Sequence, residues 1–355
     1  MSKKIILTGG GTAGHVTPNM ALIPELKQRG YEIKYIGSYD GIEKKLIEEI
    51  GIDYEGISSG KLRRYMSAKN FTDPFRVIKG YSEAKKIIKS YAPDIVFSKG
   101  GFVSVPVVLA AKKYNIPVII HESDMTPGLA NKLSISAASA ICHNFPETAS
   151  YLPKGKAILT GSPIRAELRQ GNKLAGLNMC GFTTSKPIIM VVGGSLGAVA
   201  VNEAVRGALD ILLKKYQIVH LCGKGKTDAS LKDVKGYKQF EYIKSELKDL
   251  FAMSDIVISR AGANAICEII ALRKPSILIP LSAKASRGDQ ILNAKSFKKQ
   301  GFSEVIEEEN LTKNLLVDTI NNVYEHRDKY ITAIDNAGTT DAVKTILDLI
   351  DKTSH

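Results

Sequence analysis

The sequence has no apolar run long enough to span a bilayer, and it contains few cysteines. Only three apolar residues stand between Met1–Lys4 and Thr8, too few for a secretory signal peptide. The four cysteines lie far apart, without a C-x-x-C pair or a histidine at zinc-ligand spacing: Cys142, Cys180, Cys222 and Cys267. We therefore expect a cytoplasmic protein with reduced, mostly buried thiols.

Acidic residues are scarcer than basic ones, 36 against 49, which leaves a net charge of +13. More than half of this surplus comes from residues 61–89, where nine basic residues stand against two acidic ones. Large apolar residues are interspersed among them: Phe71, Phe75, Ile78 and Tyr81. Such a mixture is typical of a surface that enters anionic lipid headgroups, although a helix whose apolar residues face the core is the alternative. The sequence contains no recognised nucleic-acid-binding module, so we expect no nucleic-acid partner.

The stretch at the start of the chain is typical of an anion-binding turn. The apolar run Ile5–Leu7 leads into the glycine cluster Gly9–Gly14, and Pro18 precedes a helical pattern, which predicts a strand, a tight turn and a helix N-terminus. Glycines let the backbone approach a phosphate, and the N–H groups of a helix's first turn attract an anion. His15 follows directly, so we expect an active-site imidazole here; the alternative is a residue that only orders the turn.

The same glycines satisfy the dinucleotide-binding fingerprint G-x-G-x-x-G. That fingerprint places an acidic residue roughly 20 residues further on. Here Asp40 comes 26 residues after Gly14, which is late. A nicotinamide or flavin oxidoreductase is therefore the less favoured interpretation.

Strand and helix patterns alternate along the first half, which predicts a parallel sheet with helices on both faces. A second glycine loop, Lys99–Ser104, follows the predicted strand Asp94–Ser98. A polar cluster, His121–Asn131, follows the predicted strand Pro117–His121. Because the crevice of an open α/β sheet lies at the carboxyl ends of its strands, we expect these loops to converge with the loop at 9–14.

The opening pattern recurs after a linker at Gly161–Arg165. A predicted strand, Ile188–Val192, runs into the glycine loop Gly193–Ala198, a helical stretch Val199–Lys215 and a strand Ile218–Cys222. The chain of 355 residues also exceeds the usual size of one hydrophobic core. The sequence thus predicts two Rossmann-like α/β domains.

We place these domains at residues 1–162 and 163–340, with the last helix, within 341–355, packing back on the first domain. In the second domain, Glu268 falls in a helix opened by Gly262, where its carboxylate could accept hydrogen bonds from vicinal hydroxyls. A solvent-facing or capping carboxylate is the alternative.

Seven motifs, in order from residue 5 to about residue 300, resemble those of the MurG family of glycosyltransferases: GGGTAGH, KGGFVS, HESDMTPGLANK, GSPIR, GGSLGAVAVN, RAGANAICE and RGDQILNA. This family adds N-acetylglucosamine to lipid I during peptidoglycan synthesis. The resemblance implies the GT-B fold, two Rossmann-like domains facing across a cleft, with UDP-N-acetylglucosamine as donor. It also implies a peripheral position on the cytoplasmic side of the cell membrane, with cell-wall synthesis and division proteins as partners.

The resemblance assigns residues to the donor and to the acceptor. Those expected to bind the donor and its sugar are Thr12, Ala13, Gly14, Asp124, Asn131, Arg165, Ser195, Leu196, Gly197, Ile243, Ala263, Asn264, Ala265, Ile266, Cys267, Glu268 and Gln290. Those expected to hold the diphosphate of the acceptor are Gly10, Gly11, Gly100 and Gly101. Two departures from the family pattern concern the sugar contacts: Ala13 replaces a glycine, and Asp124 and Asp289 stand where many members carry Asn and Gln.

The roles within this set follow the chemistry of the transfer. The Ser195 loop and Arg165 would balance the charge of the leaving diphosphate, and because the sequence has no D-x-D pair we expect no metal and no other cofactor. His15 would take the proton of the attacking 4-hydroxyl, with Asp124 or Glu122 as the alternative base. Displacement from the opposite face would give a β linkage.

Other functions stay open on the sequence alone. A related GT-B enzyme could use another lipid acceptor such as diacylglycerol, and a UDP-N-acetylglucosamine 2-epimerase would act on the donor without a membrane patch. A non-catalytic lipid- or nucleotide-binding scaffold would keep the glycine loops but turn over no substrate.

Overall fold

The computed structural model describes residues 3–60, 69–194, 197–283, 288–337 and 341–354, with the backbone alone for residues 69–74. The chain forms two compact units. The first unit comprises Met1–Arg165 and Thr340–His355, and the second unit comprises Ala166–Thr339. The chain therefore passes from the first unit to the second and returns for its last helix.

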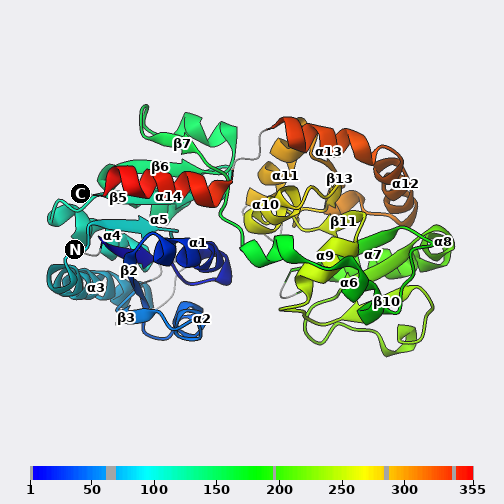
Figure 1. Cartoon of the computed structure of the whole chain (residues 1–355), viewed down its shortest axis with the longest axis horizontal. Coiled ribbons are helices and arrows are strands. Elements are labelled where there is room, and N and C mark those ends of the chain that lie inside the picture. Colours follow the sequence, from blue (N-terminus) through cyan, green and yellow to red (C-terminus); the bar gives the residue numbers. More distant parts are fainter. Residues whose placement is uncertain (1–2, 61–68, 195–196, 284–287, 338–340, 355) are drawn as a thin grey trace. The chain divides into compact units, whose positions relative to one another are not determined.

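The first unit is built on seven strands: β1 (Lys3–Thr8), β2 (Tyr31–Ser38), β3 (Asp53–Ile57), β4 (Ile95–Ser98), β5 (Val118–Glu122), β6 (Ala140–His143) and β7 (Ala157–Leu159). They form one parallel sheet in the order β3-β2-β1-β4-β5-β6-β7 (Figure 1). In register, Leu7 of β1 lies between Tyr35 of β2 and Phe97 of β4. These central strands are apolar along their length because helices cover both faces of the sheet.

The helices of the first unit are α1 (Thr17–Gln28), α2 (Ile42–Glu48), α3 (Lys69–Tyr91), α4 (Ser104–Lys113), α5 (Leu129–Ser134) and α14 (Ala342–Thr353). Helices α1 and α14 pack on one face of the sheet, where Leu22 and Leu347 share a hydrophobic cluster with Ile5. Helices α3 and α4 pack on the other face, where Ile88 and Val107 share a cluster with Val96.

The last helix, α14, is tied to the first unit by apolar and polar contacts. Its buried residues Val343, Ile346, Leu347 and Ile350 recur at the spacing of one helical face. Asp351 accepts hydrogen bonds from Arg29 at 2.5 Å and from the Tyr31 hydroxyl at 2.8 Å. The chain's C-terminal end thus completes the core begun by its first strand.

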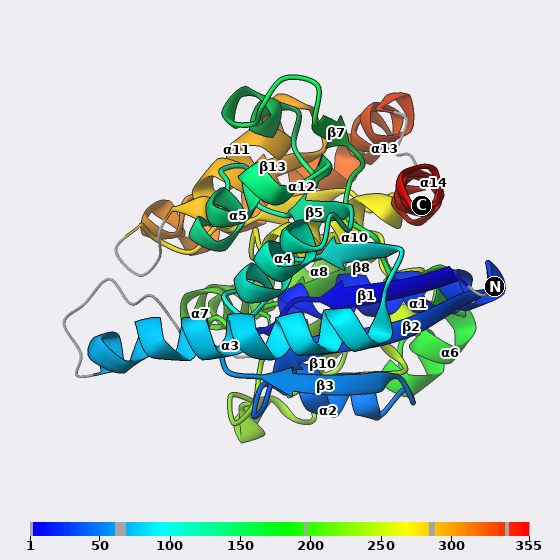
Figure 2. The ribbon, with the colours of Figure 1, turned by 90° about the vertical axis from the view of Figure 1, so that its left-hand side faces the viewer.

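In the part of helix α3 whose side chains are described, residues toward the C-terminus pack on the sheet and residues 75–79 are largely exposed. Ala84 and Ile88 are buried against the sheet, whereas Phe75 is 75% exposed and Ile78 is 66% exposed. Figure 2 shows the first turns of α3 running past the strands. No helix among the described residues combines the length and apolarity that crossing a bilayer requires.

The second unit is built on six strands: β8 (Ile188–Val192), β9 (Gln217–Leu221), β10 (Tyr237–Phe240), β11 (Ile256–Ser259), β12 (Ser276–Leu278) and β13 (Ser303–Val305). They form a parallel sheet in the order β10-β9-β8-β11-β12-β13. Its helices are α6 (Lys173–Cys180), α7 (Val199–Gly207), α8 (Leu209–Lys215), α9 (Leu247–Met253), α10 (Ala263–Ala271), α11 (Asp289–Lys299), α12 (Lys313–Glu325) and α13 (Arg327–Asn336). Helices α7, α8 and α12 contribute to one hydrophobic cluster, and α6, α9 and α10 to another.

The single helix predicted at 199–215 is two helices. Ala208 ends α7 and begins α8, with φ −104° and ψ 0°, directly after Gly207. Glycine is a poor helix former, so a break costs little here. Val205 and Leu209 still bury in the same cluster on the two sides of the break, which is why the apolar pattern looked continuous.

Each sheet reverses its strand order beside its first strand, between β1 and β4 in the first unit and between β8 and β11 in the second. In open α/β sheets, ligands bind at this switch point, outside the carboxyl ends of the strands. The glycine loops at 9–14 and 193–198 leave β1 and β8 there. The predicted parallel α/β class is confirmed, and the topology directs attention to these two loops.

Candidate active site

The first glycine loop is anchored below by buried polar side chains. The Tyr35 hydroxyl donates to the Gly9 carbonyl at 2.6 Å, and the Asn19 amide donates to the Thr8 carbonyl at 3.1 Å and to Tyr35 at 3.2 Å. Gly11 adopts φ +85°, which a residue with a side chain rarely tolerates. The path of the loop is thus set by β2 and α1 together.

The two glycine loops of the first unit meet, as the sequence predicts. The N–H of Gly10 donates to the Gly100 carbonyl at 3.3 Å, and a Cβ on Gly101 would lie 2.3 Å from the Gly10 oxygen. The N–H of Gly11 donates to the buried carboxylate of Glu43 at 3.1 Å. The N–H of Gly100 donates to the Ser98 hydroxyl at 3.2 Å. Three of the four N–H groups expected to hold the acceptor's diphosphate therefore donate within the protein.

His15 ends a short 3-10 helix, η1 (Ala13–His15), and is half-buried. Its Nδ1 lies 3.0 Å from the Thr12 hydroxyl. Burial and the positive charge of Lys99 lower the pKa of His15 to about 4, while the Gly10 backbone and the negative charge of Glu43 act in the opposite direction. The imidazole is neutral at pH 7. When Nδ1 carries the proton and donates to Thr12, Nε2 keeps a lone pair and can accept a proton.

Lys99, directly after β4, is a buried cation in the second glycine loop, and its role was not predicted from the sequence. It is 1% exposed, and its Nζ donates to Nδ1 of His121 at 2.6 Å and to the Ser123 hydroxyl. The opposite nitrogen of His121 donates to the Gly161 carbonyl at 2.9 Å, so Nδ1 is the acceptor. Burial and Lys99 hold the pKa of His121 well below its usual range. The sequence feature that could have indicated this role is a lysine between the apolar strand β4 and the two glycines Gly100 and Gly101.

The polar cluster after β5 is organised by Glu122. Its carboxylate accepts hydrogen bonds from the N–H groups of Asp124 at 3.0 Å and Gly128 at 2.9 Å, and from the Asn131 amide at 2.8 Å. Burial raises the pKa of Glu122, against the effect of these three donors. Asn131 is buried and also donates to the His121 carbonyl at 3.2 Å. Glu122 and Asn131 thus shape the loop that presents Asp124, which is half-buried.

The second glycine loop is held against the end of β9. Gly197 has φ +68°, and a Cβ there would lie 2.0 Å from the Cys222 carbonyl oxygen. That same oxygen accepts a hydrogen bond from Asn202 of α7 at 3.0 Å, and Nζ of Lys226 lies 3.5 Å from the Gly197 oxygen. Ser195 and Leu196, predicted to hold the donor's diphosphate, lie outside the described residues.

The remaining predicted donor residues of the second unit follow β10, β11 and β12, at the carboxyl edge of the same sheet. Ala263, Asn264, Ala265, Ile266, Cys267 and Glu268 form the first turns of α10, which Gly262 precedes. Gln290 lies in the first turn of α11, and its Oε1 accepts from the Leu281 N–H at 3.0 Å. Glu268 and Ile243 are half-buried.

The loops that carry these residues are braced from beneath. Arg260 donates to the carbonyls of Ile279 at 3.1 Å and Pro280 at 3.2 Å, and it pairs with Glu308. Asn293 donates to the Ala261 carbonyl at 3.2 Å. The ends of β11 and β12 are therefore linked by side chains rather than left as separate loops.

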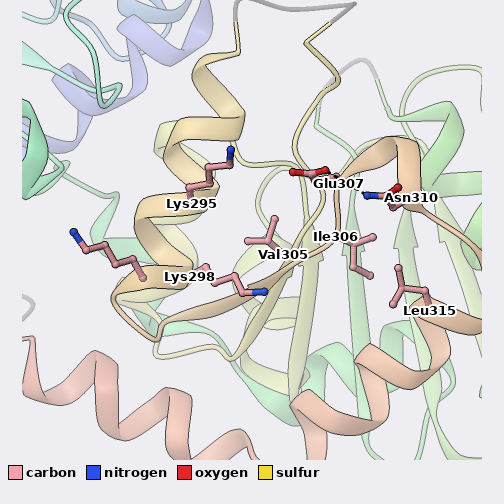
Figure 3. A pocket seen from close by; sticks show the side chains of 8 residues that line it. Lys295, Lys298, Val305, Ile306, Glu307, Asn310 and Leu315 are labelled. Atoms are coloured by element: carbon pink, nitrogen blue, oxygen red, sulfur yellow. Dashed lines mark hydrogen bonds between the residues drawn. The ribbon is translucent and has the colours of Figure 1, made fainter.

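A pocket of about 490 Å³ in the second unit lies away from these residues (Figure 3). It opens between α11, the end of β13 and the start of α12, and its lining includes none of the residues predicted to bind the donor. Lys295 and Lys298 border it from α11, and Val305, Ile306 and Leu315 add apolar lining.

Thiols and carboxylates show no metal-binding arrangement in the described part of the chain. No group of three His, Cys, Asp or Glu residues there could hold a metal ion. Cys142, Cys180 and Cys222 are buried, and Cys267 is half-buried on α10. Arg165, the last residue of the first unit, is half-buried.

Comparison with known proteins identifies the family to which this chain belongs. The profile of the glycosyltransferase family 28 N-terminal domain matches residues 5–142, and that of the family 28 C-terminal domain matches residues 188–350. The chain belongs to glycosyltransferase family 28.

Within that family, the chain is similar to a named enzyme over its whole length. It is 65% identical to the UDP-N-acetylglucosamine–N-acetylmuramyl-(pentapeptide) pyrophosphoryl-undecaprenol N-acetylglucosamine transferase of Lachnoclostridium phytofermentans, with 99% of each chain covered. It is 64% identical to the enzyme of the same name in Lachnospira eligens, again over 99% of each chain. The crystal structure of Acinetobacter baumannii MurG matches with a TM-score of 0.79 at 26% identity, over 99% of each chain. The resemblance to the MurG family and the GT-B class are confirmed.

Proposed function

We propose that this chain is an inverting glycosyltransferase that moves N-acetylglucosamine from UDP-N-acetylglucosamine to the 4-hydroxyl of N-acetylmuramic acid in lipid I. The product is the β-1,4-linked disaccharide of lipid II, a precursor of the cell wall. The proposal is carried by similarity at 64–65% identity, over 99% of both chains, to transferases that bear this activity in their names.

We assign the donor to the second unit. The loop at 193–198 and the N-terminus of α7 would take the diphosphate, because N–H groups of a helix's first turn favour an anion. Glu268 would accept the ribose hydroxyls, and Ile243 would face the uracil. The Oε1 of Gln290 is already held by the Leu281 N–H, so its NH₂ group is the part that would reach the sugar.

His15 is the proposed general base. With its Nδ1 proton donated to Thr12, its Nε2 would remove the proton of the attacking 4-hydroxyl while UDP leaves from the opposite face of C1, which inverts the configuration. Glu122 fits this role less well, because three N–H donors of its own loop hold its carboxylate. Asp124 stays the alternative base.

The diphosphate of the acceptor is assigned to the glycine loops of the first unit, with Gly101 as the strongest candidate among their glycines. The N–H groups of Gly10, Gly11 and Gly100 donate within the protein, that of Gly100 to the Ser98 hydroxyl at 3.2 Å, so these three are weaker candidates. Lys99 supplies a positive charge directly before Gly100, and a buried charge is screened less than a surface one.

The segment of α3 at residues 75–79 is the proposed contact with the membrane on its cytoplasmic side. Phe75 and Ile78 are exposed, and Arg76 and Lys79 lie beside them, also exposed. Apolar side chains can enter the headgroup layer while basic ones attract anionic lipids. Phe71 and residues 61–68 of the same predicted patch lie outside the part whose side chains are described.

We infer that the transfer needs no metal, because this chain offers other positive groups for the leaving diphosphate: the N-terminus of α7 and the guanidinium of Arg165. The decisive experiment incubates the protein with radiolabelled UDP-N-acetylglucosamine and a lipid I analogue, in EDTA and in magnesium. We expect labelled lipid under both conditions, and none when diacylglycerol replaces lipid I. Labelling only with magnesium would refute metal independence, and no labelling in either condition would refute the assigned reaction.

A further inference from the structure

Glu43 is a fully buried carboxylate to which the proposed reaction assigns no part. It is the second residue of α2 and is 0% exposed. Its Oε1 accepts hydrogen bonds from the backbone N–H of Ser38 at 3.0 Å and from the Ser38 hydroxyl at 2.5 Å. Its Oε2 accepts from the N–H of Gly11 at 3.1 Å. Three donors on a buried carboxylate are what stabilises its charge away from water.

Three glycines make room for this carboxylate. A Cβ on Gly10 would lie 2.4 Å from Oε1 of Glu43, and one on Gly41 would lie 2.2 Å from its carboxyl carbon. A Cβ on Gly37 would lie 2.7 Å from Cγ of Glu43. These glycines belong to the loop after β1, to β2 and to the turn before α2, so three segments share one small site.

The carboxylate of Glu43 occupies an N–H group of the first glycine loop. In a Rossmann-like unit, N–H groups after the first strand usually face a bound phosphate. Here the N–H of Gly11 faces Glu43 instead. In the second unit the stretch that follows the second strand brings a cation to the loop, with Nζ of Lys226 3.5 Å from the Gly197 oxygen. The charged side chain that reaches the glycine loop from the stretch after the second strand is thus the carboxylate of Glu43 in the first unit and the cation of Lys226 in the second.

We propose that Glu43 is a positioning residue that takes the place of a ligand anion on the first glycine loop and so fixes the segment that carries Thr12 and His15. The inference rests on the proposed function for its effect on catalysis, but the geometry it concerns exists without substrate. Glu43 reaches from α2 to Gly11, one residue before Thr12. Without this bond, the start of the loop keeps the hydrogen bond from the Tyr35 hydroxyl to the Gly9 carbonyl and the one from the Gly10 N–H to the Gly100 carbonyl, but Gly11 loses its link to α2.

The charge of Glu43 also acts on His15. The groups that act on the imidazole are the cation of Lys99, directly after β4, the carboxylate of Glu43 on α2, and the Gly10 backbone and Thr12 hydroxyl of the loop itself. Lys99 favours the neutral imidazole and Glu43 favours the protonated one. Glu43 therefore limits how far the pKa of His15 is lowered, which keeps its Nε2 a better proton acceptor.

The test compares Glu43→Gln with Glu48→Gln, a matched change on an exposed residue of the same helix. Glutamine keeps the shape, but its NH₂ group faces one of the three donors and leaves that donor without an acceptor. We expect Glu43→Gln to lower kcat by about 100-fold, the scale of a misplaced catalytic group, with the affinity for UDP unchanged. Ser38→Ala, which removes one donor, should lower kcat less. Glu48→Gln should behave as the wild type.

Hydrogen exchange supplies a readout that needs no turnover. In Glu43→Gln, the peptide that covers residues 9–15 should exchange faster, while peptides from β8 and β9 should exchange as in the wild type. Wild-type kcat with unchanged exchange would overturn the inference, and so would a loss of UDP binding equal to the loss of kcat, which would indicate general unfolding. If the wild type transfers no sugar but the loop still loosens in Glu43→Gln, the proposed function fails and the positioning role stands.

Discussion

The pH dependence of the reaction tests the base assigned to His15. With its pKa lowered to about 4, His15 is about 97% neutral at pH 5.5, whereas an imidazole at the ordinary value of about 6.5 would be about 9% neutral there. If His15 is the base, kcat/KM, which reports the free enzyme, should stay nearly constant between pH 8 and pH 5.5 instead of falling about tenfold. The physical cause is burial together with the nearby Lys99 ammonium.

The contribution of Lys99 to the lowered pKa of His15 can be tested by removing the positive charge of Lys99. Lys99→Met should raise the pKa of His15, so the acid limb of the kcat/KM profile should move to higher pH. Lys113→Met, on the exposed end of α4, removes the same charge and should leave the profile in place. The assay is initial rate of label transfer from pH 5 to pH 9, with UDP binding measured at each pH to show that the protein stays folded.

A wild-type profile with its midpoint near pH 6.5 would refute the reasoning about the environment of His15. An unchanged rate in His15→Ala would refute its role as base, since loss of a general base typically costs about 10²–10⁴-fold.

Four further outcomes are expected. Replacing Arg76 and Lys79 by Gln should weaken binding to anionic vesicles by about 30-fold, at about 1 kcal/mol per basic residue, in a sedimentation assay; equal binding would contradict the membrane contact. Glu268→Gln should weaken UDP binding by about 10- to 100-fold by calorimetry, and unchanged affinity would remove Glu268 from the donor site. Burial lowers the pKa of His220 to about 3, so between about pH 3 and 6.5 the unfolded chain binds a proton that the folded chain does not. In urea titrations, the free energy of unfolding should therefore fall by about 1.4 kcal/mol per pH unit for this residue as the pH is lowered from about 6.5 toward 3. His220→Asn should reduce that slope. Leu347→Ala should lower the free energy of unfolding by about 2–5 kcal/mol and speed hydrogen exchange in β1 and β4 but not in β8. Faster exchange in the second unit alone would contradict the packing of α14 on the first.

Local patterns predicted the elements that carry the glycine loops. The apolar run Ile5–Leu7 followed by glycines predicts a buried strand that ends in a sharp turn. The run Ile188–Val192 before Gly193 shows the same pattern. Both strands lie at the switch points of parallel sheets. The apolar spacing of the last helix likewise predicted a buried face, which the structure places on the first unit.

The internal partners of the loops could not be predicted, because they depend on which strands are neighbours. Lys99 meets His121 only because β4 pairs with β5, and Glu43 meets Gly11 only because β2 lies beside β1. Gly10 and Gly11 were expected to face a ligand, and sequence alone does not reveal that a carboxylate 32 residues further on takes the N–H of Gly11. The sequence shows which side chains each loop carries, whereas the order of the strands in the sheet decides which residues those side chains contact.

The return of the chain for α14 has a consequence during protein synthesis. Residues 341–354 are synthesised after the whole second unit, so the face of the first sheet that they cover stays open while the ribosome translates residues 166–339. Only when α14 has left the exit tunnel can Ile346, Leu347 and Ile350 cover the face of the sheet that β1 began. A nascent chain that stops before α14 therefore carries an exposed apolar surface of the kind that chaperones and proteases recognise.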